Sequence, residues 1–101
     1  HLAAIYLNAR NEMVFKKHIF VGTLNANICH PREIFEHALT NHASSVILVH
    51  NHPSGDPEPS KADLEITKRL IEAGKIMGID ILDHVIITKT KVFSFKEKKL
   101  I

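Results

Sequence analysis

Apolar residues along this chain fall into short runs and longer periodic stretches, and the two patterns predict strands and helices. Short runs rich in Val, Ile and Leu predict four strands, at residues 2–7, 13–21, 45–50 and 79–88. A fifth, shorter strand is supported by Val92, Phe93 and Phe95. Residues 8–12 form a turn between the first two strands, which predicts a hairpin.

Two longer stretches repeat apolar residues every three or four positions, which is the spacing of one helix face. They predict helices from residue 31 to residue 41 or 42 and from residue 60 to residue 77. Pro31 suits the first turn of a helix, and Gly78 suits the position just past a helix end. Because a helix connects the hairpin to the strand at 45–50, we expect that strand to pair in a parallel or mixed manner with an earlier one. The predicted fold is one α/β domain with a mixed β-sheet and two main helices packed on it.

Length and composition fit a single domain over residues 1–101. A chain of this size buries one modest core without disulfides or obligatory partners. It is 45% hydrophobic and 24% charged, and it has no apolar run long enough for a membrane span. Its single cysteine, Cys29, excludes an internal disulfide and fits a reducing cytoplasm. We expect a cytoplasmic protein without a membrane segment, in which this thiol is buried or inert rather than a metal ligand.

The charge of the chain does not indicate nucleic-acid binding. Its 13 basic and 11 acidic residues give a net charge of +2, whereas DNA-binding domains concentrate positive charge on one face. The one basic cluster lies near the C-terminus and consists of Lys89, Lys91, Lys96, Lys98 and Lys99. Like-charged tails are common without a nucleic-acid role, so we interpret this cluster as a solvated hairpin and tail.

The candidate chemistry lies in the segment HNHPSGDPEPSKAD, which begins at His50. The apolar strand that ends there carries His50 and His52, and side chains two positions apart on a strand point to the same face. A proline-rich loop at 53–59 breaks regular structure, and Ser60 then starts the helix that carries Asp63. Two imidazoles and one carboxylate leave a tetrahedral zinc ion with its fourth position open to water, as in catalytic zinc sites.

The same residues also have structural interpretations. Ser60 followed by Asp63 matches a helix start, with a hydroxyl cap and an acid in the first turn. His50 and His52 alone would pass for ordinary polar residues at a strand end. The pair, the acid and the rigid connector together are explained better by a metal site than by structure alone.

The remaining polar residues near the motif are assigned to structure or solvent. We expect Asp56 and Glu58 to lie in a solvated loop, because three ligands already complete an open zinc site. His84 is either an outer partner of the metal site or a structural residue, and only its position in the fold separates the two. The other histidines share no spacing with a carboxylate and are expected at the surface or in local caps: His18, His30, His37 and His42.

The motif resembles the metal-binding pattern of the JAMM metallopeptidases, also called MPN+ or JAB, which is His-x-His-Pro, a spacer and Ser-x-x-Asp. Its form here is similar to that of RadC-family bacterial proteins, long labelled DNA repair proteins. Four other segments are also similar to RadC: residues 22–25 (GTLN), 30–35 (HPREIF), 45–48 (SVIL) and 78–84 (GIDILDH). The resemblance implies a JAMM/MPN architecture, which is cytidine-deaminase-like, and a place as the C-terminal part of a longer RadC-type protein.

The resemblance also implies roles for individual residues. His50, His52 and Asp63 would hold zinc, and a water at the open position, with its pKa lowered toward neutrality, would be the nucleophile. Ser60 would donate a hydrogen bond to the oxyanion that forms when this water attacks a carbonyl.

A JAMM enzyme also uses a glutamate as general base, at the start of the first strand of the domain. In this chain the matching position falls at or just before His1, where there is no glutamate. Glu12, Glu33 and Glu36 do not match that position, so we assign the general base to no residue. A chain of these 101 residues alone is therefore expected to bind metal and to be poorly active.

We expect a zinc-dependent hydrolase that cleaves a peptide or isopeptide amide bond in a peptide or protein substrate. The alternative is a non-hydrolytic metal-binding or interaction module of a DNA-repair protein, with any DNA contact made by parts outside this chain. Phosphodiester cleavage is less well supported, because it favours a carboxylate-rich, two-metal site. The ligand set suits zinc best and would also accept iron, cobalt or nickel. The oligomeric state is open.

Overall fold

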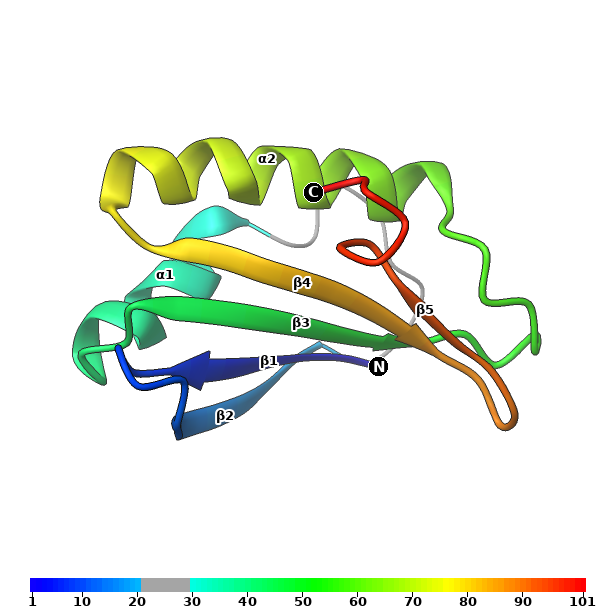
Figure 1. The fold of residues 1–101 in the computed structure, drawn as a ribbon, viewed down its shortest axis with the longest axis horizontal. Coiled ribbons are helices and arrows are strands. Elements are labelled where there is room, and N and C mark those ends of the chain that lie inside the picture. The colour runs from blue at the N-terminus through cyan, green and yellow to red at the C-terminus, as the bar shows by residue number, and fades with distance from the viewer. Residues whose placement is uncertain (21–29) are drawn as a thin grey trace.

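The chain forms a five-stranded sheet and two helices in a computed structural model that describes residues 1–20 and 30–101 (Figure 1). In chain order the elements are β1 (Leu2–Leu7), β2 (Met13–Phe20), α1 (Pro31–Thr40), β3 (Ser45–Asn51), α2 (Lys61–Met77), β4 (Asp80–Ile87) and β5 (Val92–Ser94). The predicted elements are confirmed, with ends that differ by one or two residues. Cys29 and the segment at 22–25 lie outside the described residues.

The sheet is mixed, as predicted, with the strand order β2-β1-β3-β4-β5. Only the β3–β4 pair is parallel, and the two strands of this pair are connected through α2. The other neighbouring pairs are antiparallel. β3 lies at the centre of the sheet, so its C-terminal end, which carries His50, is flanked by strands on both sides.

The expected pairing of β3 with an earlier strand was only partly right. β3 pairs with β1, and that pair is antiparallel rather than parallel. The helical connection through α1 does make β3 run in the same direction as β2, as a crossover requires. However, β1 lies between these two strands and pairs with both of them, because the β1–β2 hairpin places it next to β2.

One irregularity in the sheet determines which face of β4 each residue occupies. Val46 pairs with Ile81 and Ile47 pairs with Asp83, so Leu82 is an extra residue in β4, a β-bulge. Side chains in a regular strand alternate between the two faces of the sheet. Without a bulge, Asp83 would therefore lie on the same face as Ile81 and point toward the core. The bulge instead puts the following residue, His84, on the buried face, opposite Leu48 of β3.

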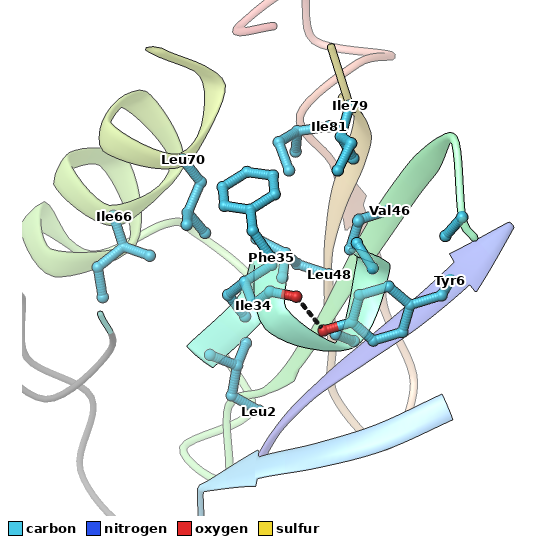
Figure 2. Packing of buried hydrophobic residues seen from close by; sticks show 13 residues of the cluster. Leu2, Tyr6, Ile34, Phe35, Val46, Leu48, Ile66, Leu70, Ile79 and Ile81 are labelled. Atoms are coloured by element: carbon cyan, nitrogen blue, oxygen red, sulfur yellow. Dashed lines mark hydrogen bonds between the residues drawn. The ribbon is translucent and has the colours of Figure 1, made fainter. Parts of the chain in front are cut away.

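Both helices contribute to one hydrophobic core on this face of the sheet. Figure 2 shows Ile34 and Phe35 of α1 and Ile66 and Leu70 of α2 gathered with side chains of β1 and β3. The hydroxyl group of Tyr6, on β1, donates a 2.7 Å hydrogen bond to the backbone oxygen of Ile34 and so ties α1 to the sheet. Neither helix in the described parts of the chain combines the length and the apolar composition needed to cross a membrane.

The ends of α2 have the features that the sequence predicted. Gly78 follows the helix with a φ of 72°, in the left-handed region that glycine adopts at low cost. Its backbone N–H donates to the oxygen of Gly74, and Ile79 N donates to the same oxygen over 2.9 Å. These contacts turn the chain sharply from the helix into β4, which brings β4 back alongside β3.

Candidate metal site

The candidate site forms where the C-terminal end of β3 meets the N-terminal end of α2. His50 lies on the buried face of β3, in register with Leu2 of β1 and Ile86 of β4. The loop at 53–59 then leads to Ser60 and to Asp63 in the first turn of α2. The structure therefore brings together the predicted residues, His50, His52 and Asp63, from a strand, a loop and a helix.

The carboxylate of Asp63 is the centre of this cluster, and its side chain is fully buried. Its Oδ1 lies 2.7 Å from His50 Nδ1, and its Oδ2 lies 3.0 Å from His52 Nε2. Oδ2 also accepts hydrogen bonds of 2.8 Å from the backbone N–H and from the hydroxyl group of Ser60. The two hydrogen bonds from Ser60 and the close contact with His50 hold this buried carboxylate in one orientation.

The electrostatics of the cluster keep Asp63 ionised. Burial by itself raises the pKa of this carboxyl, because a low-dielectric environment disfavours charge. The hydrogen bonds from His50 and from the backbone and side chain of Ser60, with the charge of His50, outweigh burial and leave the pKa below its usual range. A carboxylate that stays charged at neutral pH is the form that binds a metal ion.

Ser60 has the structural role that its position predicted. It is the N-cap of α2, and its Oγ accepts a 3.1 Å hydrogen bond from Asp63 N. The hydroxyl proton is donated to Asp63 Oδ2, and the two residues together form a capping box. The oxyanion role of Ser60 stays a prediction, because in this arrangement its only proton is already used.

His52 is oriented by a contact that the sequence did not reveal. Its Nδ1 lies 3.0 Å from the backbone oxygen of Asp56, so Nδ1 carries a proton and donates it. In the neutral ring Nε2 is then the nitrogen with the free lone pair, and it faces Asp63. Metal-binding histidines commonly show this pattern, in which the second nitrogen donates to a backbone or carboxylate oxygen. The side chains of Asp56 and Glu58 are exposed, in agreement with a solvated loop.

His84 is the residue whose role the sequence left open, and it lies in the cluster. Ligand atoms of His50, Asp63 and His84 all lie within 4.8 Å of one another, and all three residues are buried. His84 Nε2 is 3.9 Å from Asp63 Oδ1, too far for a hydrogen bond. The signal available in the sequence was the Asp83-His84 pair in the strand after α2, but the β-bulge that turns His84 inward has no clear sequence signature.

The environment of His84 keeps the ring neutral. Burial lowers its pKa from 6.5 to about 4, and the nearby His50 and His52 act in the same direction. The negative charges of Asp63 and Asp83 oppose this shift without cancelling it. The ring also stacks on Phe95, with centroids 4.6 Å apart and planes 13° apart. A neutral imidazole is the form that can coordinate a metal ion.

The spacing of these atoms fits a small metal ion. Zinc binds nitrogen and oxygen ligands at about 2.0–2.2 Å. In a tetrahedral site, two neighbouring ligand atoms are then about 3.3 Å apart. The three separations from Asp63 oxygens are 2.7, 3.0 and 3.9 Å, to His50, His52 and His84. The two separations from Oδ1, to His50 and to His84, lie on either side of that spacing. The cluster of His50, Asp63 and His84 can therefore hold a metal ion.

The glutamates considered as general base are not part of this cluster. Glu12 lies in the β1–β2 turn, beyond Leu7, while the other end of β1 pairs with His50 through Leu2. The length of β1 separates Glu12 from His50 by about 17 Å along the strand direction. Glu33 and Glu36 are exposed on α1.

Most of the other polar residues lie where the sequence placed them, but His37 does not. His30 caps α1 and accepts a hydrogen bond from Arg32 N, while His18 and His42 are exposed. His37 is half-buried, with its ring 5.5 Å from that of Phe15. The basic residues of the C-terminal cluster are all exposed: Lys89, Lys91, Lys96, Lys98 and Lys99.

A mixed sheet with two helices on one face and a His-Asp-His cluster at the end of its central strand defines a JAB-type α/β domain. The family model described as the RadC-like JAB domain matches residues 1–100 of this chain. The chain belongs to that family.

Curated relatives agree with this assignment. The chain is 56% identical over 98 residues to UPF0758 protein GK2618 of Geobacillus kaustophilus. It is 52% identical over 98 residues to UPF0758 protein BCAH187_A4587 of Bacillus cereus. These alignments cover 97% of this chain but only 43% and 44% of the relatives. The chain thus spans less than half the length of these relatives.

Proposed function

We propose that this domain is a zinc-dependent hydrolase that cleaves a peptide or isopeptide amide bond with a metal-activated water. The observation that carries the proposal is the buried carboxylate of Asp63, which joins His50 and His52 at distances of 2.7 and 3.0 Å. Membership of the RadC-like JAB domain family supports it, because the resemblance of the motif to that of JAMM metallopeptidases implies that these residues are metal ligands.

His50, His52 and Asp63 would hold the metal ion. A bound zinc ion supplies a Lewis acid that polarises a carbonyl group and lowers the pKa of water. The three protein residues are preorganised for this task by their neighbours. Asp63 is fixed by its bonds to Ser60, and His52 by its bond to the backbone oxygen of Asp56. Fixed ligands lower the cost of ordering when the ion binds.

Ser60 would act on the substrate through its hydroxyl group. To donate to an oxyanion, the hydroxyl must turn away from Asp63 Oδ2, which it contacts over 2.8 Å. The backbone N–H of Ser60 still donates to the same oxygen after that rotation, so Asp63 keeps a partner. The side chain can therefore change its hydrogen bond without releasing the carboxylate.

The general base would come from the residues that precede β1 in a longer protein of which this domain is the C-terminal part. The start of β1 lies beside the site, because Leu2 pairs with His50 and Asn51 N donates to the oxygen of His1. The relatives support a longer protein, since the chain covers only 43% of UPF0758 protein GK2618.

Metal analysis of the purified chain at neutral pH tests the first part of the proposal. We expect about one zinc per chain, and we expect His50→Ala and Asp63→Asn to abolish stable binding. His18→Ala is the matched control, because it removes an exposed histidine from β2. No zinc in the purified chain, with no uptake when zinc is added, would overturn the proposal.

Peptide cleavage tests the second part. The chain extended upstream of His1 should hydrolyse amide bonds in a library of peptides and isopeptides, and the chain that begins at His1 should be much slower. The activity should disappear in the Asp63→Asn variant of the extended chain. An extended chain that binds zinc and cleaves no amide bond would leave the metal site intact and refute the hydrolase.

A second candidate is a non-hydrolytic metal-binding module of a DNA-repair protein. One observation favours it: the hydroxyl group of Ser60 already donates to Asp63, which is a structural use of the predicted catalytic residue. In this case Ser60→Ala should leave both zinc binding and the function of the parent protein unchanged. In the hydrolase, Ser60→Ala should keep zinc and lose most of the turnover. Under either function we expect a cytoplasmic location and a protein or peptide partner.

A further inference from the structure

His84 is the one residue of the cluster to which neither the motif nor the proposed function gives a task. It lies on β4, and the β-bulge at Leu82 turns it onto the same buried face as His50. Its side chain is completely buried. An imidazole in the centre of a small domain needs a partner for each of its two nitrogens.

One nitrogen has such a partner, and that contact decides the state of the ring. Thr67 donates its hydroxyl proton to the backbone oxygen of Asp63 over 2.7 Å. A threonine hydroxyl has only one proton, so the 2.6 Å contact between Thr67 Oγ1 and His84 Nδ1 must have the ring as donor. His84 therefore carries its proton on Nδ1, and Nε2 has a free lone pair.

The second nitrogen has no hydrogen-bond partner among the described residues. His84 Nε2 lies 3.9 Å from Asp63 Oδ1, which is also an acceptor and cannot satisfy the lone pair of this nitrogen. Two acceptor atoms that face each other across this distance are both satisfied by a cation between them. The arrangement of Nδ1 donating to an oxygen and Nε2 free is also the one found in metal-bound histidines.

We propose that His84 Nε2 is a direct ligand of the metal ion that His50 and Asp63 hold. The ion then has three ligands from the buried face and His52 from the loop at the rim. Zinc sometimes expands to five ligands, so such a site would still admit a water molecule. The inference rests on the metal-binding part of the proposed function and is independent of amide-bond cleavage.

Nuclear magnetic resonance of the imidazole nitrogens tests this in the wild-type chain. Histidine is labelled with an isotope of nitrogen, and spectra are recorded with and without one equivalent of zinc. We expect His84 Nε2 to move to the position of a metal-bound nitrogen, together with one nitrogen each of His50 and His52, while His84 Nδ1 keeps its proton.

Each other outcome of that experiment has a distinct meaning. If His50 and His52 respond to zinc and His84 Nε2 keeps the signal of a free or water-bonded nitrogen, the ligand role of His84 is wrong and the metal site stands. If no histidine responds, metal binding itself fails, and both the inference and the proposed function are overturned. Failure to cleave peptides does not affect this measurement.

Two variants give a second test through X-ray absorption at the zinc edge. His84→Phe keeps an aromatic ring to stack on Phe95, and we expect one imidazole fewer around zinc with a rise of more than about 10-fold in Kd. Thr67→Val removes the acceptor for His84 Nδ1, together with the hydrogen bond to the backbone oxygen of Asp63, but it removes no ligand atom. Its Kd should therefore also rise while the number of imidazoles stays the same. An unchanged imidazole count in zinc-loaded His84→Phe would refute the proposal, because an outer partner alters affinity without leaving the coordination shell.

Discussion

Replacing His84 with phenylalanine should remove a specific part of the acid sensitivity of the metal-free chain. The pKa of His84 is about 4 in the folded protein and 6.5 when the ring is free, mainly because of burial. As the pH falls below 6.5, the unfolded state takes up a proton and the folded state does not. The contribution of neutral His84 to the free energy of unfolding is therefore fully present above pH 6.5, and it is lost as the pH falls toward 4.

The size of the effect follows from the gap between these two pKa values. At about 1.4 kcal/mol per pKa unit, the gap amounts to about 3 kcal/mol of unfolding free energy, and about 2 kcal/mol of it is lost by pH 5. That is a large share of the roughly 5–15 kcal/mol typical of a small domain. The pKa of Asp63 is lowered as well, but the contribution of this carboxyl group to stability is lost only below pH 3.8, its ordinary pKa. It therefore does not affect the comparison at about pH 5.

Urea unfolding with a chelator present, at about pH 7.5 and about pH 5, measures this contribution. The difference in unfolding free energy between the two pH values should be about 2 kcal/mol smaller for His84→Phe than for the wild type. His18→Gln is the control, because it removes an exposed histidine and should keep the wild-type difference. An equal difference in His84→Phe and the wild type would refute the reasoning, whatever the absolute stability of the variant.

Substitutions at three further positions test the fold that supports the site. Ser60→Ala removes the cap of α2 and should lower the free energy of unfolding in urea by about 1 kcal/mol; Ser60→Thr should recover most of it. Gly74→Ala would make its new methyl group overlap with the backbone oxygen of Ile79. Because the overlap is with backbone rather than with a flexible side chain, strain toward the upper end of about 1–3 kcal/mol should outweigh the gain of about 1 kcal/mol in helix propensity. The urea midpoint should therefore fall, and a rise would contradict the packing of Gly74 against Ile79. Tyr6→Phe removes the buried hydrogen bond to Ile34 and should cost about 1 kcal/mol in thermal unfolding, and no change would show that this bond does not hold α1 to the sheet.

Much of the fold was predictable because it depends on local patterns. The strand at β3 is a continuous apolar run, and α2 has both a capping residue and a glycine at its end, so their limits follow from nearby residues. Strand neighbours depend on contacts between distant segments. The position of β1 between β2 and β3 was missed for this reason, since a helical connection fixes the direction of a strand and not its neighbour.

The sequence by itself determined the two histidines, the serine and the aspartate of the motif, because each is tied to its neighbours by the short spacing of a strand end or a helix start. Only the tertiary structure placed His84 among them. A single extra residue in β4, Leu82, reverses which side chains face the core, because side chains alternate along a strand with a period of two. The same structure showed that the proton of the Ser60 hydroxyl is used by Asp63, a contact that depends on where the carboxylate lies once α2 has packed on the sheet.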